Sequence, residues 1–352
     1  MDRPLSVAVV GAGGWGATHV DNWTALEERG GVRLVAACDL NAATLAPLAA
    51  RGVKCFGDVA EMLAAARPDA VSVAVGIGAH RAVAAAALKA GAAVLCEKPA
   101  APTVADADAM IAARDAAHLP AFIAFQVIFT KEVREIKELI LSGRYGKLLS
   151  AKAVGSSFRD DAYYARNSWA GMKRTPDGRP VYDSPFANAY AHYINLALFG
   201  AGAGLEDSAR VTAVEGGLWK WRANIDNFDT CALTFQTAEG VPVSAKFSHA
   251  VTKQVPTVVT FELEAATVSW TYYGWRLLSK AGEVLREEKG DDPQRQMFRS
   301  FARHVRGAGL ENLGCTLECA REHIRAVEMA QAALPVVPLA TREEADALMA
   351  RP

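Results

Sequence analysis

The sequence lacks an excess of charge of either sign, and it lacks a long apolar run. Its 352 residues include 38 basic and 39 acidic side chains, which give a formal net charge of −1. Proteins that bind nucleic acids or anionic membranes normally carry a basic stripe or patch, and the charges here are mixed along the chain. No stretch of about 18 consecutive apolar residues occurs, so no membrane-spanning helix is predicted. Neither nucleic acid nor a membrane is therefore expected as a partner.

The sequence also has few cysteines and no pattern typical of a metal site. The six cysteines form no C-x-x-C pair and no Cys/His spacing of the kind that binds zinc. Most lie inside apolar stretches, which predicts buried free thiols in a reducing cytosol. The N-terminus passes almost directly into a strand, without the apolar region of a secretory leader. We therefore expect a cytoplasmic protein without a bound metal.

A glycine-rich loop follows the first predicted strand, which covers residues 5–10. The loop has the pattern G-x-G-x-x-G and consists of Gly11, Ala12, Gly13, Gly14, Trp15 and Gly16. A helix is predicted over 17–29 and a second strand over 33–38, which ends at Asp39. Glycines in this position allow a tight turn and a close approach of the backbone to a pyrophosphate at the helix N-terminus. Strand, loop, helix, strand and acid in this order predict a dinucleotide-binding site.

The acid at the end of the second strand indicates which dinucleotide. A carboxylate at Asp39 can accept hydrogen bonds from the ribose hydroxyls of the adenosine and would repel a 2′-phosphate. The next two residues are Leu40 and Asn41, so no arginine follows to bind such a phosphate. NAD is therefore favoured over NADP as the cofactor.

A second motif, Glu97-Lys98-Pro99, follows the apolar stretch 94–96. The stretch is predicted to be a short buried strand that ends at the proline, because proline cannot donate a ladder hydrogen bond. The carboxyl ends of parallel strands face the ligand crevice in an open α/β sheet. A lysine held there beside an acid can donate or accept a proton. The alternative interpretation is that the Glu-Lys pair only caps the strand at the surface. These residues are thus candidates for both cofactor binding and catalysis.

The order of the predicted elements indicates two domains. Repeated β–α units up to about residue 122 predict a doubly wound parallel sheet of the Rossmann type, and we assign residues 1–122 to a NAD-binding domain. Residues 123–352 are assigned to an α+β domain with a mostly antiparallel open sheet, which would bind substrate and mediate oligomerisation. The strands expected in this domain cover 148–156, 210–218, 230–236, 241–250, 258–264 and 267–273. The helices expected after the parallel sheet cover 131–142, 293–306 and 316–333.

The motifs together resemble the glucose–fructose oxidoreductase / inositol dehydrogenase / MocA (Gfo/Idh/MocA) family. The resemblance covers most of residues 5–200 and, more loosely, the sheet of the second domain. The matching features are the loop from Gly11 to Gly16, Asp39, Ala79-His80 at the start of a helix, the segment from Gly91 to Pro99, and the segment from Ile136 to Lys147. The Glu-Lys-Pro signature is the most specific of these features.

The resemblance implies a pyridine-nucleotide dehydrogenase or reductase that acts on sugars, cyclitols or their derivatives. Hydride would move between the nicotinamide and a carbinol or ketone carbon of the substrate. Lys98 matches the family lysine that contacts both the substrate hydroxyl and the nicotinamide ribose, and the Lys98–Pro99 bond is expected to be cis. The family also implies a homodimer or homotetramer, in which the second-domain sheet packs against another subunit.

A second family motif, Asp-x-x-x-His at the start of a helix, is present here with changed residues. His192 matches the histidine, while Asn188 replaces the acid and Asn195 replaces a frequent acid three residues later. All three positions are expected on one helical face. Without a neighbouring carboxylate, His192 would receive less electrostatic support for its protonated form. We therefore expect His192 and Lys98 to share the proton transfer, while Asn188 orients the substrate by hydrogen bonds.

Other residues near these motifs are further candidates. For substrate binding we add Asp183, Tyr163 and Trp169 to Asn188 and Asn195. For cofactor binding we add Trp15, His80 and Glu97 to the loop glycines, to Asp39 and to Lys98. Ile128 stands where many family members have an arginine, which removes one expected contact.

Two other functions compete with a dehydrogenase. A glycosidase that uses NAD transiently would share the fold and leave no net change in cofactor redox state. A non-catalytic NAD-binding protein is the second alternative, because Asn188 and Asn195 could mark a site that has lost its activity. The presence of both Lys98 and His192 argues against that loss.

Overall fold

The computed structural model describes residues 3–307 and 314–351, and the chain forms two compact units. The N-terminal unit comprises Met1–Ala101, Ala105–Thr130 and Asp292–Leu317. The C-terminal unit comprises Pro102–Val104, Lys131–Asp291 and Glu318–Pro352. Within the described part of the chain, no helix is long and apolar enough to cross a membrane.

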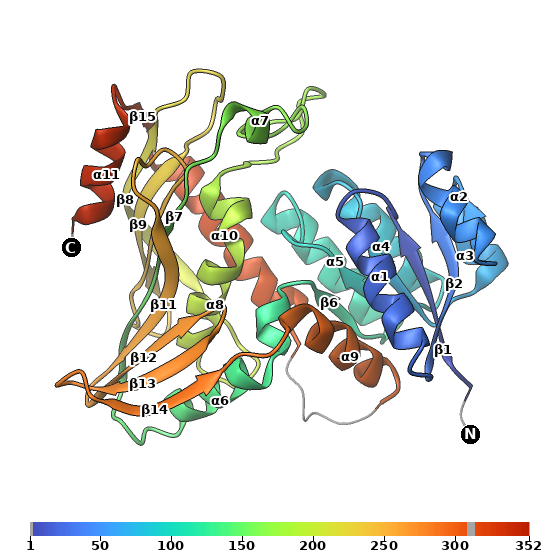
Figure 1. Ribbon diagram of the computed structural model, residues 1–352, viewed down its shortest axis with the longest axis horizontal. Helices are drawn as coiled ribbons and strands as arrows, with labels where there is room; N and C mark the ends of the chain where they lie inside the picture. The colour runs from blue at the N-terminus through green and yellow to red at the C-terminus, as the bar shows by residue number, and fades with distance from the viewer. Residues whose placement is uncertain (1–2, 308–313, 352) are drawn as a thin grey trace. The chain divides into compact units, whose positions relative to one another are not determined.

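The N-terminal unit is built on a parallel sheet of six strands in the order β3-β2-β1-β4-β5-β6 (Figure 1). The strands are β1 (Leu5–Val10), β2 (Val32–Cys38), β3 (Lys54–Phe56), β4 (Ala70–Val73), β5 (Ala93–Cys96) and β6 (Ala121–Ile123). Strands β4 and β5 are buried along their whole length, as expected for a parallel sheet covered by helices. This strand order is that of a dinucleotide-binding Rossmann fold, and it confirms the predicted fold of this region.

Helices connect these strands, and the first of them begins within one residue of the predicted start at position 17. The helices are α1 (Gly16–Glu27), α2 (Ala42–Ala50), α3 (Val59–Ala66), α4 (His80–Lys89) and α5 (Val104–Ala117). The side chain of Asn41 caps α2 by accepting a hydrogen bond from the backbone of Ala43. Asp58 caps α3 in the same way through the backbone of Glu61.

A late helix, α9 (Pro293–Val305), also belongs to the N-terminal unit. Its apolar face buries Phe298 and Phe301, which lie edge-on to the ring of Trp23 on α1. Close by, the backbone N–H of Ile123 on β6 donates to the carbonyl of Cys315. The chain thus returns to complete the first unit. The expected division at residue 122 differs from this arrangement because local sequence patterns do not show which core a distant amphipathic helix will cover.

The C-terminal unit is built on a sheet of nine strands in the order β14-β13-β12-β11-β7-β10-β9-β8-β15. The strands that the sequence predicts are β7 (Leu148–Ser156), β8 (Val211–Lys220), β9 (Thr230–Thr237), β10 (Val243–Ser248), β11 (Val255–Leu263) and β12 (Ala266–Thr271). Most pairs are antiparallel, as expected, but β10 pairs with β7 and β15 pairs with β8 in parallel. The mostly antiparallel sheet of the second domain is therefore confirmed.

Three further strands and a terminal helix were not predicted. They are β13 (Gly274–Ser279), β14 (Val284–Lys289), β15 (Val336–Pro338) and α11 (Arg342–Ala350). Strand β14 lies at the sheet edge, and its sequence VLREEK is mostly charged and exposed. Charged edge strands avoid unwanted pairing, and they lack the apolar alternation that would identify them in a sequence.

The remaining helices of the C-terminal unit are α6 (Lys131–Leu141), α7 (Asp161–Tyr164), α8 (Ala191–Ala201) and α10 (Leu317–Ala333). Helix α8 packs against β7, β10 and β11, and nearly all of its residues are buried. Lys137 on α6 is fully buried, and its ammonium group donates to the carbonyls of Phe199, Gly202 and Asp207 at the C-terminal end of α8. A cation at this end of α8 compensates the negative end of the helix dipole.

Candidate active site

The predicted glycine loop connects β1 to α1 and adopts a conformation that requires glycine. Gly11 and Gly14 have φ angles of 81° and 53°, in the region that other residues rarely adopt. A Cβ atom at Gly16 would lie 1.7 Å from the carbonyl oxygen of Gly11. The loop backbone therefore folds tightly against itself.

The geometry of this loop fits a pyrophosphate-containing cofactor. No side chain caps the N-terminus of α1, and its first turn contains no acidic residue. Asp39 lies at the end of β2, where its Oδ2 accepts a hydrogen bond of 3.0 Å from the backbone of Gly13. Its Oδ1 accepts a second bond of 2.8 Å from the backbone of Asn41. An uncapped helix N-terminus beside a glycine loop attracts phosphate, and an acid after β2 is placed to bind ribose hydroxyls.

A hydrogen-bonded network joins this loop to the Glu97-Lys98 segment. The indole N–H of Trp15 donates to Oε1 of Glu97 at 3.0 Å, although the rest of the Trp15 side chain is largely exposed. His19 Nε2 lies 2.9 Å from the same oxygen, and His19 Nδ1 lies 2.7 Å from the hydroxyl of Ser72. The backbone N–H of Lys98 donates to Oε2 of Glu97 at 3.0 Å. The carboxylate thus fixes both the glycine loop and the backbone of the candidate catalytic lysine.

The charge of Glu97 is stabilised by these neighbours. Burial alone would raise the pKa of this carboxyl group. The hydrogen bond and charge of His19, the nearby charge of Lys98 and the backbone N–H of Lys98 outweigh burial and hold the pKa below its usual value. Glu97 therefore carries a negative charge at neutral pH and anchors the loop and the backbone of Lys98.

The segment after Glu97 is held by His80. The Lys98–Pro99 peptide bond is cis, as the resemblance implies. His80 is buried, with Nδ1 3.0 Å from the carbonyl oxygen of Pro99 and Nε2 3.0 Å from that of Val75. Burial lowers the pKa of His80. A direct contact of His80 with a cofactor stays a prediction, while its contacts within the unit indicate that it positions the Pro99 backbone.

Three candidate residues of the C-terminal unit, Asn188, His192 and Asn195, lie in a π-helical turn, Pro185–Ala189, or in helix α8, which follows it. Asn188 lies in this turn and His192 lies in the first turn of α8, so a single continuous α-helix does not carry both residues. The break follows from Ser184, whose hydroxyl caps the π-helical turn, and from Tyr190, whose backbone bonds to Pro185. His192 is partly exposed, whereas Asn195 is fully buried. The roles of these two side chains in catalysis and substrate binding stay predictions.

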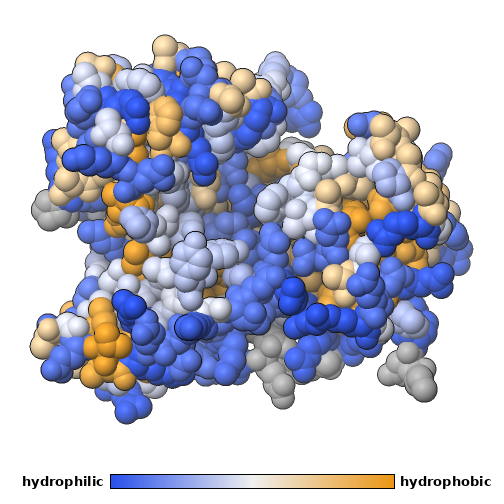
Figure 2. Space-filling model, in the orientation of Figure 1, coloured by the Kyte–Doolittle hydropathy of each residue, from blue (hydrophilic) through white to orange (hydrophobic). Residues whose placement is uncertain are grey.

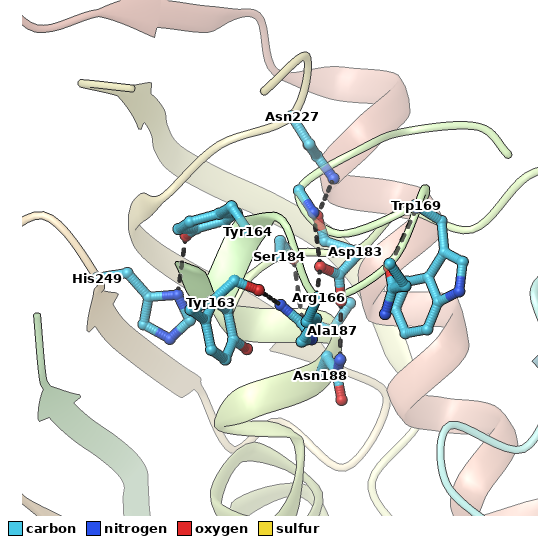
Figure 3. A network of polar contacts seen from close by, with 12 residues as sticks. Tyr163, Tyr164, Arg166, Trp169, Asp183, Ser184, Ala187, Asn188, Asn227 and His249 are labelled. Carbon is cyan, nitrogen blue, oxygen red and sulfur yellow. Dashed lines mark hydrogen bonds and ion pairs between the residues drawn. The ribbon is translucent and has the colours of Figure 1, made fainter. Parts of the chain in front are cut away.

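Asp183 supplies a carboxylate next to Asn188 (Figure 3). Its Oδ1 accepts a hydrogen bond of 2.8 Å from Nδ2 of Asn188, and its Oδ2 accepts one of 2.7 Å from the backbone of Gly171. The Asp183 side chain is buried, and Arg166 forms an ion pair with it at 3.5 Å. An ionised carboxylate only accepts hydrogen bonds, so the amide nitrogen of Asn188 must face Asp183. The acid that the motif lacks at position 188 is therefore present five residues earlier.

Tyr163 and Trp169 lie on either side of Arg166. The guanidinium carbon of Arg166 lies 3.9 Å from the ring centre of Tyr163 and 5.6 Å from that of Trp169. Arg159 approaches the Tyr163 ring at 5.1 Å. The three expected substrate-binding residues Tyr163, Trp169 and Asp183 thus surround one arginine.

His249 is a residue near this arginine that the sequence did not identify as a candidate. It follows β10, and its Nδ1 lies 3.0 Å from the hydroxyl of Tyr164 (Figure 3). Burial, followed by the positive charges of Arg159, Arg166 and Arg222, lowers the pKa of His249 well below its usual value. The neutral imidazole can donate or accept a hydrogen bond in a region of positive potential. No local spacing in the sequence connects His249 with Tyr164, because 85 positions separate them.

Comparisons with known proteins agree with this geometry. Residues 5–125 match the family model Gfo/Idh/MocA, described as an oxidoreductase family with a NAD-binding Rossmann fold. Over 166 residues the chain is 30% identical to D-apiose dehydrogenase of Paraburkholderia graminis, covering 46% of this chain and 44% of that protein. Over 157 residues it is 32% identical to inositol 2-dehydrogenase of Corynebacterium glutamicum, covering 44% and 46%. The chain thus matches less than half the length of these curated relatives.

Solved structures share the fold over nearly the whole chain. The WlbA dehydrogenase of Bordetella pertussis, solved with NADH and UDP-GlcNAcA, superimposes with a TM-score of 0.74 and 20% identity over 94% of this chain and 96% of that chain. The UDP-N-acetylglucosamine 3-dehydrogenase GnnA of Acidithiobacillus ferrooxidans gives a TM-score of 0.74 and 18% identity over 97% and 99%. At these identities the likeness establishes the fold alone. The N-terminal part of the chain, residues 5–125, thus resembles the Gfo/Idh/MocA oxidoreductases in sequence, and its strand order is that of their Rossmann fold.

Proposed function

We propose that this protein is a NAD-dependent oxidoreductase that acts on a carbinol or ketone group of a sugar, a cyclitol or a sugar derivative. The observation that carries the proposal is the network around Glu97, which links the glycine loop through Trp15 to the backbone of Lys98. Such a link is expected where one cofactor must meet both the loop and a proton-transferring lysine. The named activities of the relatives support the class of substrate.

In this proposal, the candidate residues have different tasks in the reaction. NAD, when bound, would accept or donate the hydride. The uncapped N-terminus of α1 would hold its pyrophosphate, and Asp39 would bind its adenosine ribose. Lys98 and His192 would exchange the proton of the substrate hydroxyl. Asn188, whose amide is oriented by Asp183, would accept a hydrogen bond from that hydroxyl or its neighbour.

The pairing of Asn188 with Asp183 also supports an active site over a lost one. A decayed site would have no need of a buried carboxylate whose bond fixes the orientation of the amide. NADP stays the less favoured cofactor, because Asp39 would repel a 2′-phosphate.

The test is to incubate the protein with NAD and a panel of polyols and sugars, and to follow the absorbance of the reduced cofactor. Lys98→Met should reduce turnover by about a hundredfold or more, because general acid–base catalysis contributes about 10²–10⁴, while NAD affinity changes little. Lys89→Met, on the exposed end of α4, is the matched control and should keep wild-type turnover.

Three results would contradict parts of the proposal. Wild-type turnover of Lys98→Met would remove this lysine from the mechanism. Release of a sugar without net NAD reduction would favour the glycosidase alternative. Binding of NAD without turnover of any polyol, sugar or ketose would favour a non-catalytic binding protein.

A further inference from the structure

A groove between α1 and α9 in the N-terminal unit lies outside the residues discussed above. It has a volume of about 270 Å³. It is lined by Leu26, Arg29, Gly30, Gly31, Val32, Arg299, Ala302, Arg303 and Arg306. An adjoining hollow of about 230 Å³ shares Leu26, Arg29 and Arg299 with it. Among its described lining residues, the larger groove therefore has four arginines and no carboxylate.

The arginines of α9 recur at a regular interval. Arg295, Arg299 and Arg303 are each four residues apart, so they lie on one face of the helix. The exposed side of α9 is strongly hydrophilic (Figure 2). Like charges at this spacing repel one another and slightly destabilise a helix.

Only part of this positive charge is neutralised within the protein. Arg295 forms an ion pair with Asp292 at 3.8 Å. The Arg306 guanidinium donates to the carbonyl of Gly31. Among the residues that the structure describes, Arg299 and Arg303 have no carboxylate within 4.0 Å and no hydrogen-bond acceptor.

The helix dipoles give an ordinary reason for some of these arginines, but not for all. Arg29 follows the C-terminal end of α1, and Arg303 and Arg306 lie at the C-terminal end of α9. The C-terminal end of each of these two helices contributes about half a negative charge. Together they compensate about one of the four positive charges in the groove and leave about three uncompensated. Arg299 lies in the middle of α9, where the dipole has no effect.

The groove is also separate from the dinucleotide loop of the same unit. The loop lies at the N-terminal end of α1 and the groove at its C-terminal end. A helix of 12 residues separates its ends by about 18 Å at 1.5 Å per residue. The volume of the groove is smaller than the roughly 300 Å³ at which typical small-molecule sites begin, so it suits a compact ligand.

We propose that this groove binds a compact polyanion with two or more phosphate or carboxylate groups. Guanidinium groups hold such oxygens by paired hydrogen bonds, and Arg29, Arg299 and Arg303 can approach one ligand from both helices. Leu26 and Ala302 add apolar side chains to the lining of the groove. Gly31, with a φ angle of 90°, brings the backbone close to Arg306 without a side chain that would fill the groove.

The experiment is calorimetric titration of the full chain with tripolyphosphate and, in a second series, with citrate. Both are measured in about 150 mM salt, where long-range attraction between exposed charges is screened, and with NAD present to occupy the dinucleotide loop. Arg299→Gln should weaken binding at least about tenfold, as expected for a charge-assisted hydrogen bond. Arg81→Gln, which removes one charge from exposed α4 in the same unit, should leave binding unchanged.

The comparison of the two ligands distinguishes a phosphate site from a carboxylate site, and binding of either one supports the proposal. Circular dichroism checks that Arg299→Gln is folded. If it is not, Arg303→Gln, whose side chain is exposed, takes its place with the same expected loss. No heat of binding with either ligand, or an equal loss in the groove variant and in Arg81→Gln, would overturn the proposal.

Discussion

Replacement of Glu97 by glutamine tests the network that joins the glycine loop to Lys98. The carboxylate accepts hydrogen bonds on both oxygens, from Trp15 and His19 on Oε1 and from the backbone of Lys98 on Oε2. Glutamine has the same shape but offers one oxygen and one NH₂ group. In either orientation of the amide, at least one N–H of Trp15 or Lys98 faces another donor.

The expected loss follows from that mismatch. His19 can change its tautomer and accept from the new NH₂ group, so the cost falls on one unsatisfied donor. A buried donor without an acceptor costs about 1–3 kcal/mol. In a unit of this size each kcal/mol lowers the melting temperature by about 2–4 °C. The Glu97→Gln variant should therefore melt about 2–12 °C below the wild type at pH 7.

The pH dependence gives a second, independent check. The pKa of Glu97 is lower in the folded protein than in the unfolded chain. Its stabilising contribution is therefore complete above the unfolded pKa of about 4.3 and is lost as the pH falls through the folded pKa. The difference in melting temperature between the Glu97→Gln variant and the wild type should be constant from about pH 6 to about pH 8, because the carboxyl group of the unfolded chain has a pKa of about 4.3. The difference should shrink below about pH 4.3.

Differential scanning calorimetry of the full chain measures both effects. Glu61→Gln, which removes an exposed carboxylate from the first turn of α3, is the matched control and should lose at most about 1 kcal/mol. A melting temperature of Glu97→Gln equal to that of the wild type at pH 7 would refute the anchoring role of the carboxylate.

Two further predictions concern the C-terminal unit. Lys137→Met should lower the free energy of unfolding by about 3 kcal/mol, because buried carbonyls lose a charged donor. Chemical denaturation measures this loss. Lys131→Met, at an exposed position of the same helix, should change the free energy of unfolding by less than about 0.5 kcal/mol. An equal effect of both changes would contradict the capping role of Lys137. Asn188→Asp should place a second carboxylate against Asp183 and raise the pKa of the pair. The variant should therefore become less stable as the pH rises from about 5 to about 8. Thermal melts at both pH values test this, with Asn167→Asp in the same loop as the control; parallel behaviour of the two variants would contradict it.

The parallel sheet and its loop could be predicted from the sequence because their signals are local. The strand before Gly11, the acid after β2 and the proline after Lys98 each mark an element within a few residues. The six main strands of the second sheet were also predicted, since their alternating apolar residues face a core.

The rest depends on contacts between distant parts of the chain. The bond between Asp183 and Asn188 could have been suspected from their spacing, but the packing of Arg166 between two aromatic rings could not. The pairing of Tyr164 with His249 requires that β10 lie beside β7 in the sheet. No residue near either position in the sequence indicates that arrangement.

The return of α9 to the N-terminal unit has a consequence for synthesis on the ribosome. The unit needs Phe298 and Phe301 to cover Trp23, and it needs Cys315 to bond to β6. After Thr130 emerges, the chain must still be extended to Leu317 before these contacts can form. At the usual speed of translation this takes roughly 10–40 s. During that interval the apolar face of α1 and the edge of β6 are exposed, so the nascent chain is a natural substrate for chaperones that bind apolar segments.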